Sequence, residues 1–228
     1  KTVISFKGRQ FKKVIILMGM RWYLSYSLSY RNIEELMAER GVDVDHSTVN
    51  RWVINYSPKL EAKFSNVHKK KIGSSWRMDE TYIKVKGKWC YLYRAVDKSG
   101  ATIDFMLAKQ RDKKAAKRFF NKAIGYSGRP EKITIDKSGS NNAALKSINE
   151  GLTEPNTIEI RQIKYLNNIV EQDHRFIKRI TKPMMGFKSF QSACATLDGI
   201  ELCHMLRKNQ HSSAENTPIF ELFYALAA

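Results

Sequence analysis

The chain has 228 residues, 43% of them hydrophobic, which is enough to bury a full-sized core without disulfide or metal staples. It carries 40 Lys and Arg against 22 Asp and Glu, giving a formal net charge of +18. Such an excess indicates a polyanionic partner, because neutralising phosphates releases condensed counterions. The longest apolar run, Val14–Met20, is far shorter than the roughly 20 residues of a membrane span. We expect a protein that binds nucleic acid and has no membrane-spanning segment.

The cysteines favour a reducing compartment. Cys90, Cys194 and Cys203 show no paired spacing, so the sequence predicts no disulfide framework. Cys203 and His204 are adjacent but lack two further ligands, and we expect them to pack in the core rather than bind zinc. A cytoplasmic location follows.

Residues 11 to about 60 have the periodicity of helices. Phe11–Tyr23 is apolar on a wide face, and apolar residues recur at helical spacing in 33–37 and 49–56. Between the last two helices Gly41 predicts a helix end, and one of three residues caps the next helix: Asp45, His46 or Ser47. Two short helices joined by such a turn form a helix-turn-helix.

The second helix of this pair carries the candidate DNA contacts. If Val49, Trp52 and Val53 face the core, four side chains of this helix remain exposed: Ser47, Thr48, Asn50 and Arg51. These side chains can bind base edges in the major groove and backbone phosphates. An ordinary helical hairpin would show the same pattern. The charge excess favours DNA binding.

From Ser75 the pattern changes to strands. Trp76–Lys86 alternates between two faces, and turns at Gly87-Lys88 and Ser99-Gly100 lead into Trp89–Val96 and Thr102–Leu107. This predicts a three-stranded antiparallel meander. The remaining elements expected are the helices Ala115–Ile124, Asn142–Glu150, Asn168–Ile180 and Gln191–Arg207, and the strands Lys132–Asp136 and Thr157–Ile163. The chain is therefore expected to be an α/β protein with a mixed sheet and helices on both faces.

Three acidic residues occupy strand or helix positions at which an isolated carboxylate calls for a structural or functional explanation. Asp79 has the strand parity of the face expected to be buried. Asp136 ends an apolar strand, where sheets open toward ligands, and Glu171 lies on the helix after the last strand. Each acid taken singly also fits a helix cap or a surface residue, and sequence spacing alone does not show that the three converge.

Converging carboxylates would imply a cation. Acids brought together repel one another and are costly to desolvate, so a cluster of them usually holds a metal. All-oxygen ligands select Mg²⁺ or Mn²⁺ over zinc. Two such ions about 3.5–4 Å apart promote in-line phosphoryl displacement.

Long motifs follow one another along nearly the whole chain. They are Ser29–Glu35, Asp45–Trp52, Trp76–Gly87, Tyr91–Asp97, Ile135–Lys137, Lys164–His174, Gly186–Phe190 and Gly199–Glu201. In sequence and order they closely resemble the IS6 (IS26-like) family of insertion-sequence transposases, which are of the DDE type.

The resemblance implies an RNase H-like catalytic core with Asp79, Asp136 and Glu171 as the metal-binding triad. The spacing between Asp136 and Glu171 is the one that this family is known for. It further implies two Mg²⁺ or Mn²⁺ ions as cofactors. The segment Ser138–Asn141 departs from the more apolar stretch of relatives, so substrate positioning differs there, but no ligand is lost.

Basic and amide side chains surround the triad in the sequence. Lys178 stands where the family keeps a basic residue, two helical turns beyond Glu171, and Arg175 shares that face. Either cation would hold a substrate phosphate, unless it forms an ion pair with Glu171. Lys164, Asn167 and Asn168 are expected to contact the DNA backbone, although a helix cap explains either asparagine equally well.

The expected organisation is a helix-turn-helix domain at 1–60, a basic linker at 61–74, a catalytic domain at 75–207 and a tail at 208–228. The expected function is a bacterial transposase that binds its element ends as double-stranded DNA, cuts them and joins them to target DNA, as a dimer or larger. There are two alternatives: a nuclease that cuts DNA without joining it, and a DNA-binding regulator whose catalytic core is inactive.

Overall fold

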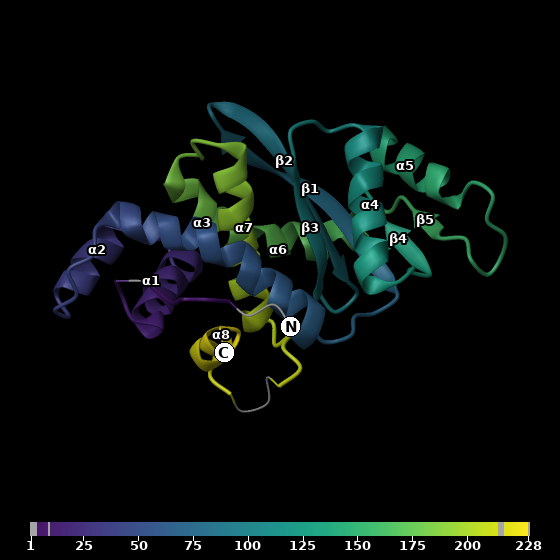
Figure 1. Ribbon diagram of the computed structural model, residues 1–228. Coiled ribbons are helices and arrows are strands. Elements are labelled where there is room, and N and C mark those ends of the chain that lie inside the picture. Colours follow the sequence, from purple (N-terminus) through teal and green to yellow (C-terminus); the bar gives the residue numbers. More distant parts are fainter. Residues whose placement is uncertain (1–3, 9, 214–216, 228) are drawn as a thin grey trace. The chain divides into compact units, whose positions relative to one another are not determined.

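A five-stranded mixed sheet forms the middle of the chain in the computed structural model, which describes residues 4–8, 10–213 and 217–227 (Figure 1). The strands are β1 (Ser75–Val85), β2 (Lys88–Asp97), β3 (Thr102–Ala108), β4 (Lys132–Thr134) and β5 (Glu159–Arg161). Their order is β3-β2-β1-β4-β5, with the first three antiparallel and β4 and β5 parallel to β1. The predicted meander and the RNase H-like mixed sheet are confirmed.

The β1–β2 hairpin sets the two faces of the sheet. Lys86 and Gly87 both have positive φ, at 50° and 76°, which is the two-residue turn that suits the twist of paired strands. Within β1, ahead of the turn, Thr81 and Ile83 are buried on one face of the strand while Tyr82 is exposed on the other. The predicted alternation therefore holds.

Helices cover both faces of the sheet. On one face, α4 (Lys113–Ser127) and α5 (Gly139–Asn149) enclose a core that contains Trp76, Met78, Phe119 and Phe120. On the other, α6 (Asn168–Thr181) is tied to β2 by an ion pair between Asp173 and Arg94, 2.8 Å long. The 3₁₀ turn η2 (Lys164–Asn167) leads into α6, and η3 (Lys182–Met184) follows it.

The chain divides into two compact units. One is Lys71–Phe176, which contains the sheet, and the other combines Lys1–Lys70 with Ile177–Ala228. Helix α6 crosses the boundary between them. These units reflect packing, and the division of the chain at 60, 74 and 207 stays a prediction about domains.

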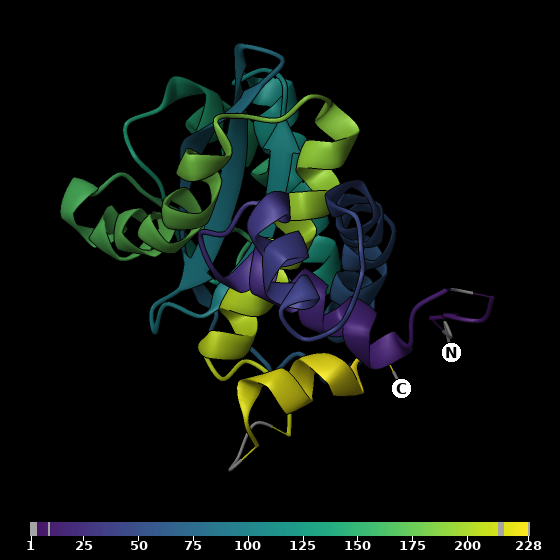
Figure 2. The same ribbon diagram turned by 90° about the vertical axis from the view of Figure 1, so that its left-hand side faces the viewer.

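The second unit is helical. Its helices are α1 (Lys13–Ser25), α2 (Tyr30–Ala38), α3 (His46–Lys63), α7 (Phe190–Arg207) and α8 (Ile219–Ala225). Helix α7 packs against α3 and α1, and α8 packs against α1 and α7 (Figure 2). None of the helices in the described part of the chain combines the length and apolar character needed to span a membrane.

Two expected boundaries were wrong. The helices were expected to end at about residue 60, but α3 passes through Pro58 to Lys63 and continues as a π turn, η1 (Phe64–His68). Leu60 and Phe64 are fully buried, and this burial outweighs the lost backbone hydrogen bond at proline. Strand β4 ends at Thr134, so Asp136 lies just beyond the strand instead of ending it.

Gly199 permits the close approach of three helices, and its replacement tests this packing. A Cβ at Gly199 would lie 2.6 Å from Leu24 Cδ1 and 2.7 Å from Ser57 Oγ. We expect Gly199→Ala to lower the free energy of unfolding by about 1–3 kcal/mol through overpacking. Gly125→Ala is the control, since nothing lies within 4 Å of its Cβ and alanine favours helix, so stability rises by up to about 1 kcal/mol. Thermal unfolding midpoints measure both, and equal midpoints for the two variants would contradict the packing.

Candidate functional site

Asp79 lies where β1 loses its neighbour. Strand β4 pairs with β1 only from Ser75 to Arg77, so the edge of β1 is open from Met78 onward. Asp79 projects to the face that carries the buried Thr81, as its parity predicted, and its side chain is 18% exposed. The open edge is the place where a carboxylate on a central strand can meet residues from other elements.

Asp136 reaches the same edge, and Glu80 joins the pair. One carboxylate oxygen from each of Asp79, Glu80 and Asp136 lies within 4.8 Å of the others. The amide of Ser138 donates to Asp136 Oδ1 at 3.0 Å, which fixes that carboxylate ahead of α5. The sequence did not predict Glu80 here, because its strand parity is opposite to that of Asp79.

Arg111 lies between two of these acids. Its guanidinium donates to both Glu80 carboxylate oxygens, at 3.3 and 3.2 Å, and to Asp136 Oδ2 at 3.2 Å. Partial burial by itself lowers the pKa of Arg111, but Glu80 and then Asp136 outweigh it and raise that pKa above its usual value. The loop after β3 thus supplies a permanent positive charge to the acidic cluster.

Asn141 fixes the Glu80 side chain from α5. Its Nδ2 donates to Glu80 Oε1 at 3.1 Å, and the asparagine is fully buried. With Arg111 on one side and Asn141 on the other, Glu80 is only 3% exposed. Asn141 belongs to the segment whose sequence departs from the IS6-like pattern, and the structure gives that departure a contact at the site.

The environment of Asp79 opposes its ionisation. Burial first, and then the charges of Glu80, Asp136 and Glu171, raise the pKa of Asp79 to about 6, against an ordinary value of 3.8. Glu171 therefore lies near enough to act on Asp79. It is exposed on α6 and is not one of the three acids whose oxygens cluster in the described residues.

Three contacts place α6 beside β1 and β2. The Arg94 guanidinium, fully buried, donates to Asp173 Oδ2 at 2.8 Å. Asn167 Nδ2 donates to the carbonyl of Met78 at 3.2 Å, at the open edge of β1. His174 is buried with Nδ1 3.8 Å from Asp79 Oδ2. These contacts hold the turn of helix that carries Glu171.

The other predicted contacts near Glu171 have mixed positions. Asn167 is 1% exposed and bound to the strand, so in this structure it holds α6 in place of the expected DNA contact or cap. Asn168 and Arg175 are exposed, and no ion pair between Arg175 and Glu171 occurs among the described residues. Lys178 is likewise exposed on α6, and the side chain of Lys164 lies outside the described residues.

The two helices predicted to form a helix-turn-helix, α2 and α3, have well-formed caps. Ser29 and Asn32 form a capping box at the start of α2, and the turn at Gly41 has φ of 70°. Asp45 caps α3 by accepting from the Ser47 amide at 2.8 Å, so of the three residues considered it is the N-cap. Among the candidate DNA contacts Arg51 is exposed and donates to Thr48 Oγ1 at 2.7 Å.

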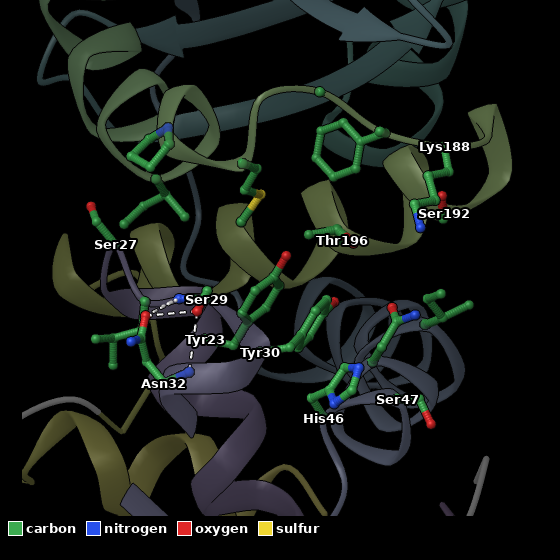
Figure 3. A pocket seen from close by; sticks show the side chains of 18 residues that line it. Tyr23, Ser27, Ser29, Tyr30, Asn32, His46, Ser47, Lys188, Ser192 and Thr196 are labelled. Atoms are coloured by element: carbon green, nitrogen blue, oxygen red, sulfur yellow. Dashed lines mark hydrogen bonds between the residues drawn. The ribbon is translucent and has the colours of Figure 1, made fainter. Parts of the chain in front are cut away.

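A cavity of about 620 Å³ adjoins this helix pair (Figure 3). Tyr30 and His46 from the helix pair line it, together with Lys188 and Thr196 from the C-terminal part of the same unit. Ser47 and Asn50 also line the cavity, so these two candidate DNA contacts border a concave surface and not a flat helix face.

Comparison with known proteins identifies the family. A family profile described as a DDE domain matches residues 73–210. The transposase for insertion sequence-like element IS431mec of Staphylococcus aureus strain Mu50 is 42% identical over 227 residues, which cover 98% of this chain and 99% of that protein. The chain belongs to the IS6 family of DDE transposases. The transposase of insertion sequence element IS257 in transposon Tn4003 of Staphylococcus aureus is 41% identical over the same share.

Solved structures resemble this transposase more distantly. The catalytic core domain of the HTLV-2 integrase, in complex with magnesium, aligns with a TM-score of 0.39 at 19% identity, over 48% of this chain and 70% of that one. A simian T-cell lymphotropic virus intasome in complex with a PP2A regulatory subunit aligns with a TM-score of 0.45 at 14% identity, over 81% and 72%. The strand order of the transposase itself carries the fold assignment.

The acidic cluster of the transposase fits a hard cation. Its donors are all carboxylate oxygens, the ligand type that Mg²⁺ and Mn²⁺ prefer. Burial, and then the charges of Glu80, Asp136 and Glu171, raise the pKa of Asp79, so its ionised form is disfavoured and a bound divalent cation would offset that cost. Arg111 offsets only part of the negative charge, because its contacts go to Glu80 and Asp136 and not to Asp79.

Replacing Asp79 by asparagine should stabilise the metal-free protein. The folded chain protonates Asp79 below about pH 6 and the unfolded chain only near 3.8, so this carboxyl destabilises the fold as pH rises through that window. We expect Asp79→Asn to raise the free energy of unfolding at pH 7 by about 2–3 kcal/mol, and the gain to vanish near pH 4. Thermal unfolding in EDTA measures it.

The control for this prediction is Asp43→Asn, at an exposed site in the turn before α3, which should change the unfolding midpoint little. Added Mg²⁺ should stabilise the wild type more than Asp79→Asn. If Asp79→Asn were less stable than wild type at pH 7 in EDTA, the idea that ionised Asp79 destabilises the fold would be contradicted.

Proposed function

We propose that Asp79, Asp136 and Glu171 bind the catalytic metals, two Mg²⁺ or Mn²⁺ ions, with which this transposase cuts its element ends and joins them to target DNA. The convergence of Asp79 and Asp136 at the open edge of β1, with Glu171 acting on Asp79, is the observation that carries this assignment. When bound, the ions activate the attacking oxygen and stabilise the leaving oxygen of an in-line displacement.

The chain's own side chains would set the geometry of the reaction. Arg111 and Asn141 hold the Glu80 carboxylate away from solvent, which leaves Asp79 and Asp136 facing the open edge. Water attacks the phosphorus at the element end and the 3′ oxygen leaves with a proton as a 3′-OH. That hydroxyl then attacks a target phosphodiester, and the target's own 3′ oxygen leaves. No enzyme side chain forms a covalent bond with DNA.

The helix-turn-helix would recognise the element-end sequence and so determine where the DNA is cut. Thr48, Asn50 and Arg51 at the start of α3 suit base edges in the major groove, and Ser47 suits a phosphate. Arg175 and Lys178 are exposed cations that would hold a DNA phosphate beside the metals. Asn168 and Lys164 remain proposed backbone contacts. Two element ends must be held together, so the active species is a dimer or larger assembly, acting in the bacterial cytoplasm.

Asp136→Asn tests the chemistry. We expect it to lower the rates of cleavage and strand joining, on DNA that carries the element's own ends with Mg²⁺ or Mn²⁺, by at least about a thousandfold, because metal stabilisation of the displacement amounts to several kcal/mol. Glu131→Gln, an exposed acid beside the other end of β4, is the matched control and should keep wild-type activity.

The products separate the alternatives. Joined products from wild type, with none from a variant that still binds DNA, support the proposal. Cleavage without joining under every divalent metal would indicate a nuclease. If wild type binds the ends and never cuts, the chain is a DNA-binding remnant.

Arg51→Ala tests recognition. Arg51 is exposed on the first turns of α3, and we expect its loss to weaken binding to the element-end duplex by about tenfold or more and to relax the sequence preference at the base pair that it contacts. Lys59→Ala changes an exposed cation farther along the same helix and serves as the control. Equal losses for the two variants would indicate charge attraction without specific docking by the start of α3.

A further inference from the structure

Aromatic and basic side chains follow Glu80, one member of the acidic cluster, along one face of the β1–β2 hairpin. The face that carries Glu80 continues through two cross-strand pairs, Tyr82 opposite Tyr91 and Lys84 opposite Trp89. We name these four residues, Tyr82, Lys84, Trp89 and Tyr91, the hairpin stripe. At about 3.3 Å per residue the stripe reaches about 13 Å from Glu80, the length of about four stacked nucleotides.

Two of the three rings of the stripe are widely exposed to solvent, and the third, Tyr91, is half-buried against the core. Trp89 is 59% exposed and Tyr82 53%. Their ring centroids are 6.1 Å apart with planes at 75°, and Tyr91 lies 5.5 Å from Tyr82. Strand β3 pairs with β2 only up to Tyr91, so at Trp89 strand β2 is paired with β1 alone.

Positive charge accompanies these rings. Lys84 is exposed between them, and Lys86 and Lys88 are exposed at the tip of the hairpin. At the other end, Tyr82 is near enough to Arg111 to affect its ionisation. Exposed rings interleaved with lysines match the surfaces that bind single strands, where bases stack on aromatic faces and cations follow the phosphates.

We infer that the hairpin stripe binds an unpaired DNA strand that leads away from the carboxylate site. This inference rests on the proposed function, since strand cutting frees an end beside Asp79 and Asp136. A duplex offers base edges and phosphates but no open base faces, so the exposed rings fit an unpaired strand better than a paired one. The stripe would thereby hold the cut end in place between cleavage and joining.

A purely structural role makes a different prediction. Cross-strand aromatic pairs also stabilise hairpins, and any large apolar side chain at position 89 would serve that purpose. Binding of bases needs a flat aromatic face. Phenylalanine and leucine at this position therefore separate the two roles, because both keep an apolar contact but only phenylalanine keeps a ring.

The test measures binding of a twelve-residue oligothymidylate to the full chain without divalent metal. We expect Trp89→Leu to weaken binding by about tenfold and Trp89→Phe to stay within about twofold of wild type, with unfolding midpoints unchanged. Stacking should also quench the fluorescence of Trp89, since the other tryptophans, Trp22, Trp52 and Trp76, are partly or fully buried. Tyr126→Ala removes an exposed ring on α4 and is the control.

Three outcomes would overturn the inference: wild-type oligothymidylate binding by Trp89→Leu, equal losses in the leucine and phenylalanine variants, or a changed oligomeric state in Trp89→Leu with strand binding intact. The last would assign the stripe to contact with a second copy of the chain. Because the assay needs no metal, its result is independent of the Asp136→Asn experiment, and either proposal can fail while the other stands.

Discussion

The buried ion pair between Arg94 and Asp173 is the constraint on which the site depends. Arg94 is fully buried and Asp173 is 10% exposed, so the two charges have little water to replace their partner. Breaking such a pair by removing one member costs about 3–5 kcal/mol, because the other charge stays buried and uncompensated. Since Asp173 lies two residues beyond Glu171, the pair that secures α6 also fixes where Glu171 stands relative to β1.

The contacts of α6 bring Glu171 close to a cluster of like charges. Asp79, Glu80 and Asp136 meet at one strand edge with Glu171 nearby, and the cost shows in the raised pKa of Asp79. The rest of the fold must supply the stability that the cluster removes, through the core on the α4 and α5 face and the contacts of α6. Carboxylates that are costly to ionise favour a bound cation, which fits the divalent metal use of DDE transposases.

The sequence predicted what is periodic and missed what depends on three-dimensional convergence. Alternation in β1 placed Asp79 on the buried face, and the family motifs predicted Asp136 and Glu171 as its partners. Glu80 was missed because its parity directs it to the opposite face, and only the early end of β4 lets both side chains reach one edge. Arg111 lies in a loop whose position no local pattern fixes. The helix through Pro58 was missed because burial overrode a local breaking signal.

The short pairing between β1 and β4 accounts for both surfaces of the hairpin. Had β4 continued beside β1, its backbone would have taken the hydrogen bond that Asn167 makes to Met78, and the carboxylates would have lost their open edge. The same early end leaves the outer half of β1 paired with β2 alone, and in that half the side chains of Tyr82 and Lys84 are exposed on one face. One omitted stretch of pairing thus leaves open the edge at which the acidic residues meet and the ribbon that we propose binds an unpaired strand.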